Sequence, residues 1–582
     1  MMKQRTIMDM LLKRYDERVA LLEADAAITF SDAACVTDRK KYLKEIMTAI
    51  DANQIAIAFQ PVIFATNRSR TLVTEYKADR RGSNLSAADV FGIVSSPDVF
   101  VWLPDKIFPD LKIPCNFCGK HFASKEWCKP REVVGLTKTY IYLTVKYRCR
   151  RCSGVKRRET IASDNRDMQT RRICKDTKVS ADDPSFLQRL PSHVKSCWSF
   201  HTRGKLLCDI AVLDLVRALA TRSSWSAIAD TLNEMHEAEW NRSVLYNYKS
   251  ICDTLDIRIS SAAASTRSTK IISAQWIRNL YMTDASVRKV SAMQELSNQL
   301  GDDILVLDWT VDAATKCQSK YLLNAMDGQR HILLSVLMDS CHPFQAAEHL
   351  KTLAHRGVSP RVVYVDSECC GAWRTVVARF WKDAIVCLDV LHAMRRLSQT
   401  VVSTQHPSHL AFCHALSDAF FSYDNAIMKR LRAAQVRECN SFSMSVQLKK
   451  KYVPRIITDP ARICRAIERV LQDFRIPHKD AGCLLTDLTG EAWRNLKIHV
   501  EAGCLCDPEG VDLNIAGDAD MIGGEEFVSY RSRRGTSALE GFHTHQKLWL
   551  GTLATHSKNA GSALLTDGAV RWNRKRKNNR SS

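Results

Sequence analysis

The spacing of apolar residues changes along the chain and divides it into regions. From residue 303 onward, four short runs rich in β-branched residues, DILVLDWTV, HILLSVLMD, RVVYVDS and AIVCLDV, are separated by segments of helical spacing. This alternation predicts an α/β layer around a largely buried sheet. Residues 205–295 and 400–500 have helical spacing instead. The pattern therefore predicts a multidomain protein that combines α+β and α/β parts.

The net charge of the chain indicates which class of molecule it binds. The chain has 84 Lys and Arg against 63 Asp and Glu, a net charge of +21 over 582 residues. This excess favours a polyanion, first nucleic acid and then a membrane surface, because neutralising phosphates releases counterions. A soluble basic protein is the alternative. The longest apolar run, HILLSVLM at 331–338, is far shorter than the roughly 18 residues of a membrane span. We therefore expect an intracellular protein that crosses no membrane.

Two cysteine pairs, CNFC and CRRC, have the spacing of zinc ligands. They are Cys115, Cys118, Cys149 and Cys152. Two such turns, joined by a hairpin that includes the strand-like TKTYIYLTVKYRC, predict a zinc ribbon with one structural zinc ion. His121 and Cys128 are rival ligands, and four buried cysteines without a metal are a further alternative. The ribbon could bind DNA or pack against the rest of the protein.

The region after the cysteine pairs holds a candidate DNA-binding module. Its spacing predicts three helices, with Ser223 or Ser224 capping the second and Asn241 capping the third. The third helix would carry Arg242 and Lys249 beside aromatic residues, a combination that suits a DNA major groove. The pattern indicates a helix-turn-helix-like region, and ordinary three-helix packing is the alternative.

Three acids form the candidate catalytic set. Asp308 ends the apolar run ILVL, and Asp366 ends RVVYV. An ionised carboxylate at the edge of a buried sheet costs desolvation energy unless it is paired or binds a cation. Two such strands in one sheet can bring both acids to one metal, and Glu540, at the start of an amphipathic segment, is the third candidate. Oxygen ligands of this kind suit magnesium or manganese.

The order Asp308, Asp366, Glu540 resembles the DDE transposases of eukaryotic DNA transposons, which have an RNase H-like fold, in particular the Mutator-like, hAT and Kyakuja-Dileera-Zisupton groups. The gaps of 58 and 174 residues are similar to theirs, the second being filled by a helical insertion. Asp389 and His392 in CLDVLHAMRRL fit the (C/D)xxH element of these groups. RGTSALEGFH is similar to their Arg-Gly-Thr-Ser/Asn…Glu segment.

This resemblance implies a nuclear, homo-oligomeric enzyme that binds the double-stranded DNA of transposon ends and target. Asp308, Asp366 and Glu540 would hold two magnesium or manganese ions about 3.5–4 Å apart for the cleavage and joining of strands. Asp389 and His392 would be accessory residues. His392 would orient a neighbour or contact DNA, and a histidine of the core is the alternative.

Other charged residues beside the acids leave alternatives open. Asp312 could compete with Asp308 as a ligand, and Glu368 would face the same way as Asp366 if the strand continued. Three arginines precede Glu540 and suit phosphate binding, a solvated basic turn being the alternative. They are Arg531, Arg533 and Arg534.

These patterns divide the chain into consecutive parts. We expect an N-terminal region of unknown role at 1–105, the zinc ribbon at 106–160, a connector at 161–205, the helical DNA-binding region at 206–295, an RNase H-like core at 300–400 and 531–575, a helical insertion with an acidic loop at 401–530 and a basic tail at 576–582. Two other functions stay open: a catalytically silent, zinc-containing DNA-binding protein derived from a transposase, and a repair nuclease of resolvase-like or RNase H-like type.

Overall fold

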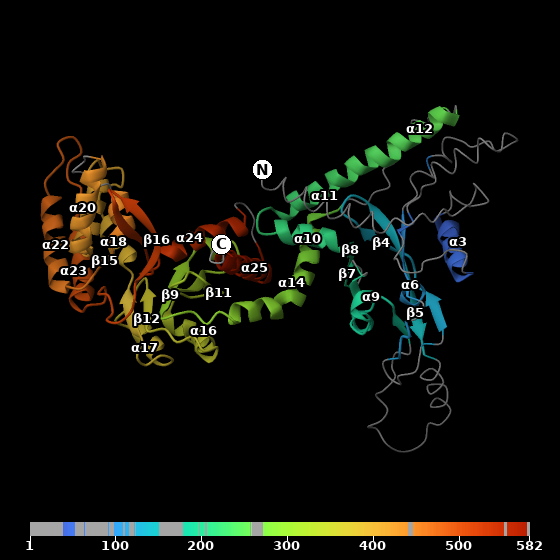
Figure 1. Ribbon diagram of the computed structural model, residues 1–582, viewed down its shortest axis with the longest axis horizontal. Coiled ribbons are helices and arrows are strands. Elements are labelled where there is room, and N and C mark those ends of the chain that lie inside the picture. The colour runs from blue at the N-terminus through green and yellow to red at the C-terminus, as the bar shows by residue number, and fades with distance from the viewer. Residues whose placement is uncertain are drawn as a thin grey trace, which may run out of the picture. The chain divides into compact units, whose positions relative to one another are not determined.

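The structure of the protein is a computed structural model (Figure 1). It describes residues 39–52, 63–64, 91, 98–108, 111–115, 122, 124–149, 178–196, 198, 200–203, 206–255, 258, 272–439, 446–551 and 556–578. The chain forms two compact units, Met1–Asp284 and Ala285–Ser582. Each combines helices with sheets, so the predicted multidomain α+β architecture is present at this level.

The first unit is built around a sheet of eight strands with β5 at its centre. Its order is β1-β2-β5-β4-β8-β7, and β3 and β6 also pair with β5. The strands are β1 (Ile63–Phe64), β2 (Val99–Trp102), β3 (Ser124–Trp127), β4 (Arg131–Val134), β5 (Thr139–Arg148), β6 (Lys178–Ser180), β7 (Phe200–Arg203) and β8 (Leu206–Asp209). The strand predicted from TKTYIYLTVKYRC is β5. It pairs with four other strands, β2, β3, β4 and β6, and so belongs to the main sheet of the unit.

The expected connector at 161–205 differs from the structure over its described part. Residues 178–203 supply β6, β7 and the short helices α8 (Pro184–Leu187) and α9 (Ser192–Ser196). Phe186, Leu190 and Val194 are buried in the aromatic core of the sheet. Pro184 begins α8 behind the Asp183 cap, a position where proline is favoured because its missing N–H is not needed. Pro184 therefore begins a helix inside the segment that was expected to be a connector.

The N-terminal region expected at 1–105 shares this core. Helix α3 (Arg39–Asp51) contributes Leu43, Ile46 and Ile50 to the same cluster as β2 and β5, and α6 (Pro104–Ile107) follows β2 directly. The described parts of 39–107 therefore belong to the same sheet domain as the segment expected to be a separate ribbon.

The helical region of this unit lacks the expected turn. Helix α10 (Ile210–Leu219) is followed by α11 (Trp225–Glu239), whose N-cap is Ser224, as predicted. From there the chain continues through a π-helical stretch, η1 (Trp240–Leu245), into α12 (Tyr246–Leu255) without a break. Asn241 therefore lies inside one long helical segment, and the helix-turn-helix arrangement is not formed. No glycine or proline stands between 225 and 255 to stop the helix.

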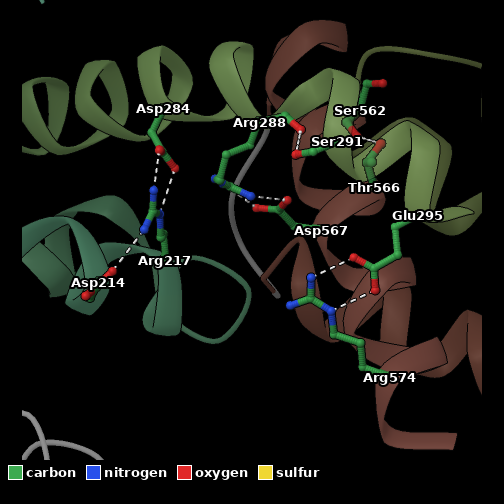
Figure 2. Close-up of polar contacts among 10 residues, drawn as sticks. All are labelled: Asp214, Arg217, Asp284, Arg288, Ser291, Glu295, Ser562, Thr566, Asp567 and Arg574. Atoms are coloured by element: carbon green, nitrogen blue, oxygen red, sulfur yellow. Dashed lines mark hydrogen bonds and ion pairs between the residues drawn. The ribbon is translucent and has the colours of Figure 1, made fainter. Parts of the chain in front are cut away.

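Helix α14 (Ala274–Ser297) contains the boundary between the two units, and ion pairs hold it within each of them (Figure 2). In the first unit, Arg217 of α10 donates to both carboxylate oxygens of Asp284, at 2.6 and 3.0 Å. In the second unit, Arg288 donates to both oxygens of Asp567 at 2.8 and 2.9 Å. Paired geometry of this kind fixes the planes of both side chains.

The second unit contains a mixed sheet of five strands in the order β11-β10-β9-β12-β13. The strands are β9 (Ile304–Thr310), β10 (Tyr321–Asp327), β11 (Ile332–Met338), β12 (Val362–Val365) and β13 (Ile385–Leu388). Strands β9 to β11 are antiparallel neighbours, whereas β12 runs parallel to both β9 and β13. The four predicted apolar strands are β9, β11, β12 and β13, and β10 is an additional strand.

Helices cover both faces of this sheet. Leu305 and Leu307 of β9 lie in one hydrophobic cluster and Ile304 and Val306 in another, because side chains alternate along a strand. The helices around the first half of the core are α15 (Asp312–Thr315), α16 (Pro343–His355), α17 (Ala372–Ala378) and α18 (Val390–Ser398). The last part of the chain adds α24 (Ser537–Trp549) and α25 (Lys558–Asn578). The α/β layer predicted from the apolar runs is therefore present.

The segment between these parts is mainly helical, as predicted. It contains α19 (His409–Phe420), α20 (Asn425–Cys439), α21 (Val446–Tyr452), α22 (Pro460–Asp473) and α23 (Asp487–Glu501), together with the short pair β14 (Ser422–Tyr423) and β15 (Arg455–Ile456).

The acidic segment of the insertion, residues 501–526, was expected to be a loop, and this holds only for its first half. Residues 514–532 form a hairpin of β16 (Asn514–Ile522) and β17 (Glu525–Ser532), which turns at two glycines with positive φ. Its acids have basic partners on the insertion helices: Asp520 pairs with Lys451, and Glu525 pairs with Arg430 and Arg437. Because these acids are paired with basic residues, the segment can form strands although its acidic composition indicated a solvated loop.

The expected basic tail differs as well. Helix α25 extends to Asn578, and the buried side chain of Asn573 bonds both the N–H and the carbonyl of Ile332 at 2.8 and 2.9 Å. This contact fixes the last part of the helix on the edge strand β11. Residues 579–582 lie outside the described residues. None of the described helices is long and apolar enough to cross a membrane.

Close packing of α25 against α24 predicts a glycine requirement. A Cβ at Gly568 would lie 2.1 Å from Cε3 of Trp549, so Gly568→Ala should lower the unfolding free energy by about 1–3 kcal/mol. In the control Gly490→Ala, on α23, a Cβ meets no atom within 4 Å, and the unfolding free energy should rise by about 0.5–1 kcal/mol. Denaturant unfolding measures both. Equal effects of the two substitutions would contradict this packing.

Candidate functional site

Asp308 lies on β9, and Asp366 directly follows the neighbouring parallel strand β12. Strand β12 pairs with β9 with Val362 opposite Ile304 and Tyr364 opposite Val306. The same offset, continued two residues further, places Asp366 opposite Asp308. Asp308 is buried, with a relative exposure of 2%, and its Oδ1 accepts the N–H of Trp309 at 2.8 Å. Asp366 follows the last residue of β12 and is half-buried.

Glu540 approaches the same place from the first turn of α24. This helix is fixed to the sheet by Gln546, which exchanges hydrogen bonds of 2.8 and 3.1 Å with Asn324 and donates to Ser335 at 3.0 Å. Asn324 stands opposite Asp308 in the ladder of β9 and β10. A fully buried amide pair therefore sets how far Glu540 lies from Asp308.

His392 completes a group that we call the acid–histidine cluster: Asp308, His392 and Glu540. Each can offer one ligand atom such that these atoms all lie within 4.8 Å of one another. His392 Nε2 is 3.8 Å from Glu540 Oε1. The histidine predicted to orient a neighbour thus lies inside the cluster, whereas Asp366 is outside this tightest group and acts on Asp308 electrostatically.

Asp389 connects the histidine to the segment before Glu540. It caps α18, its Oδ1 accepting the His392 N–H at 2.8 Å and lying 3.1 Å from His392 Nδ1. Its Oδ2 accepts the N–H of the buried Thr536 at 2.6 Å. The hydroxyl of Thr536 lies 3.1 Å from His392 Nδ1 as well. The Asp-x-x-His and Arg-Gly-Thr elements of the sequence are therefore in direct contact.

Two arginines of α18 hold the acids and were missed by the sequence reasoning. Arg395 forms an ion pair with Glu540, and Arg396 donates to the backbone carbonyl of Asp366 at 2.8 Å. They stand three and four residues after His392, which is the spacing of one helix face. This spacing could have indicated that both arginines lie on the same helix face as His392. Their partners, Glu540 and Asp366, could not be identified because they lie far away in sequence.

The rival ligands take other roles. Asp312 is largely exposed and pairs with Lys547 of α24. Glu368 has a φ of 50° and is exposed. Because β12 ends at Val365, the alternation that would have aligned Glu368 with Asp366 does not continue.

The arginines before Glu540 are held mainly by acids. Arg533 pairs with Asp302 at 2.5 Å, and the buried Arg534 donates to both oxygens of Asp507 at 2.6 and 2.7 Å. Arg531, Arg533 and Arg534 line a cavity of about 450 Å³ that Asp389 also lines. Arg533 and Arg534 therefore fix the end of the hairpin through their ion pairs. The expected role of all three arginines in binding phosphate stays a prediction.

Burial sets the electrostatics of the cluster. The pKa of Asp308 is raised to about 8, first by burial and then by the charges of Asp366 and Glu540, while His392 acts in the opposite direction. Burial would lower the pKa of His392, but the hydrogen bond to Asp389 and the charge of Asp308 raise it above its usual value. The pKa of Asp389 is lowered despite burial, because His392 and Thr536 donate to it. A cation bound at Asp308 would favour the ionised carboxylate and so lower its pKa again.

The other predicted residues lie in the first unit. Cys115 and Cys149, one from each CxxC pair, are buried and pack together beside Phe122, while Cys118, Cys152 and His121 lie outside the described residues. Cys128 lies near Ser180, at 3.8 Å. Arg242 and Lys249 are exposed on the long helical segment.

The comparisons with known proteins cover a small part of the chain. A family model described as a domain of unknown function (DUF6729) matches residues 162–286. A search of the curated proteins finds no match. The matched residues belong mostly to the first unit, so the acid–histidine cluster lies outside them.

The buried Asp308 predicts a pH-dependent stability in protein freed of metal by a chelator. Its pKa rises from 3.8 to about 8 on folding, so the stability from its protonated form is full below pH ~4 and lost as pH rises through ~8. Asp308→Asn should match the wild type at pH ~4 and exceed its unfolding free energy by roughly 2–4 kcal/mol at pH ~8.5. The control Asp312→Asn should change it by less than about 1 kcal/mol. An equal gain for Asp308→Asn at both pH values would contradict the assignment.

Gly535 predicts a second effect at the site. Its φ is +72°, and a Cβ there would lie 2.0 Å from Asp389 Oδ2. Gly482 has a φ of +76° with no atom within 4 Å of its Cβ position, so Gly482→Ala carries the backbone cost of about 1–2 kcal/mol alone. Gly535→Ala should lose at least about 1 kcal/mol more in unfolding free energy. Equal losses would show that Asp389 is not held against this turn.

Proposed function

We propose that the protein is a transposase-type enzyme that binds double-stranded DNA and cleaves and joins its strands with two divalent metal ions. The observation that carries this proposal is the convergence of Asp308, Glu540 and His392 on one point beside Asp366, from segments separated by up to 232 residues. A five-stranded mixed sheet with Asp308 on one strand and Asp366 directly after the neighbouring parallel strand supports an RNase H-like core of the DDE type.

The residues present fit magnesium or manganese. Carboxylate oxygens are the ligands that these ions prefer, and an imidazole beside them is also accepted by manganese and other transition metals. The raised pKa of Asp308 shows that its negative charge has too little compensation among the protein groups around it. Asp308, Asp366 and Glu540 would hold the ions. Bound there, the ions would activate the attacking oxygen and stabilise the leaving one.

The protein groups around the acids have distinct tasks. Asp308, on a buried strand, is the most rigid ligand. Glu540 stands on a helix held by Gln546, and its ion pair with Arg395 gives it a cation partner that a metal ion would replace. Arg395, once released, would lie beside the scissile phosphate and could donate to its oxygens. Asp389 keeps His392 oriented toward Asp308 and Glu540.

The rest of the chain supplies features that suit DNA. The net charge of +21 favours a polyanion, and the exposed Arg242 and Lys249 lie on a long helical segment that could contact phosphates. A structural zinc ion on Cys115, Cys118, Cys149 and Cys152 belongs to this proposal, as do location in the nucleus and a homo-oligomeric state.

A catalytically silent DNA-binding protein derived from a transposase is the second candidate. The specific observation in its favour is that Glu540, Arg533 and Arg534 are all engaged in ion pairs. In this case the acids would maintain the fold, and the first unit would provide the function.

Nicking of a supercoiled plasmid in the presence of Mn²⁺ distinguishes the two candidates and needs no knowledge of the recognised sequence. Asp308→Asn, Asp366→Asn and Glu540→Gln keep the side-chain shape while removing the charge, and each should lower the nicking rate at least about 100-fold. Asp312→Asn, four residues from Asp308 and paired with Lys547, is the matched control and should retain the wild-type rate.

Gel shifts of the same proteins at two salt concentrations complete the test. All variants should bind duplex DNA, with an affinity that falls steeply as salt increases. Nicking that persists in the three variants, or is absent from the wild type with every divalent ion while DNA binding remains, would favour the silent protein.

A further inference from the structure

A second group of metal-ligating side chains lies apart from the acid–histidine cluster. Cys369 and Cys370 stand in the turn between β12 and α17, His499 in the last turn of α23, and Cys504 in the turn after that helix. Their ligand atoms all lie within 4.8 Å of one another. We call this group the cysteine–histidine cluster.

The separations are those of ligands around one ion. The two neighbouring sulfurs of Cys369 and Cys370 are 3.8 Å apart, and His499 Nδ1 lies 3.2 and 3.4 Å from them. The sulfurs of Cys370 and Cys504 are 2.9 Å apart. A tetrahedron with zinc–sulfur bonds of about 2.3 Å and a zinc–nitrogen bond of about 2.0 Å has edges of roughly 3.5–3.8 Å. Small side-chain rotations would bring all four atoms to these edges.

Local backbone structure presents the four side chains to one point. Helix α23 ends at Glu501, and the chain reverses at Gly503, whose φ is +73°. The N–H of Cys504 then bonds the carbonyl of His499 at 3.0 Å, and the carbonyl of Cys504 accepts the N–H of Leu388 on β13 at 2.8 Å. On the other side, the N–H of Gly371 bonds the carbonyl of Glu368 at 3.0 Å and closes the turn that carries the two adjacent cysteines.

We propose that Cys369, Cys370, His499 and Cys504 bind one zinc ion. Three sulfurs and one imidazole nitrogen form a soft donor set that selects zinc over the magnesium or manganese expected at the carboxylates. Four protein ligands leave no position for water, so the ion is structural. Cys369 and Cys504 have exposures of 1% and 7%, which places the ion between the insertion and the core, where it would tie the two together.

The position of this zinc ion has a consequence for the acids. Cys369 lies three residues after Asp366, in the same turn, and His499 belongs to the helical insertion. A zinc ion would therefore fix the turn that holds Asp366 to α23. This consequence, unlike zinc binding itself, rests on the proposed function.

Zinc content of the purified full chain, measured by mass spectrometry of the metal, tests the site. Cys504→Ser should contain about one zinc equivalent less than the wild type, however much zinc Cys115 and its partners hold. His499→Cys keeps four ligands and should retain the full content. Cys506→Ser is the matched control, because this half-buried cysteine lies two residues from Cys504 and outside the cluster.

Absorption spectra of the cobalt-substituted proteins distinguish the loss of one ligand from misfolding of a variant. Sulfur-to-cobalt charge-transfer absorption should be weaker in Cys504→Ser than in the wild type and stronger in His499→Cys, which adds a thiolate. Unchanged zinc content in Cys504→Ser would overturn the proposal, and so would a Cys370–Cys504 disulfide in the wild-type protein purified without reductant.

The zinc result is separable from the catalytic proposal. Asp308→Asn should retain all its zinc while losing DNA nicking. If the wild type nicks no DNA but Cys504→Ser still loses one equivalent, the proposed function fails and the zinc site stands. If Cys504→Ser keeps its zinc while the wild type nicks DNA, the zinc site fails alone.

Discussion

Burial of the Asp308 carboxylate within a five-stranded sheet is the constraint around which the site is organised. A buried negative charge costs several kcal/mol unless a cation or hydrogen-bond donors compensate it. Three groups compensate part of this charge. Trp309 donates a backbone N–H to Asp308, Asp389 holds His392 close to it, and Arg395 neutralises the neighbouring Glu540. These partners leave the pKa of Asp308 near 8. A divalent cation is the partner that would remove the remaining cost.

The sequence allowed prediction of the elements that depend on local pattern. Asp308 and Asp366 end β-branched runs, so both strands and their acids could be predicted from the sequence. Paired residues of β9 and β12 are 58 residues apart in sequence, which is also the separation of Asp308 and Asp366. Strand β10 was missed because its sequence, YLLNAMD, is rich in helix-forming residues. Its strand conformation comes from pairing with β9 and β11 on both sides.

The features that could not be predicted depend on contacts between distant residues. The Arg395–Glu540 pair joins positions 145 residues apart, and the adjacent Cys369 and Cys370 lack the CxxC spacing that marks a zinc turn in sequence. Acidic composition suggested a loop at 501–526, but Lys451, Arg430 and Arg437 supply partners and permit a hairpin. The insertion is thus integrated with the core through ion pairs and, in our proposal, through a zinc ion beside Asp366.

Anomalous diffraction from crystals of the full chain grown with Mn²⁺ would show whether Asp308, Asp366 and Glu540 bind a divalent cation. We expect a manganese ion bonded to the carboxylates of Asp308 and Glu540, with Asp366 in its coordination sphere and Arg395 moved away from Glu540. A saturating concentration of Mn²⁺ that leaves no peak at Asp308, with Arg395 still paired to Glu540, would contradict this expectation.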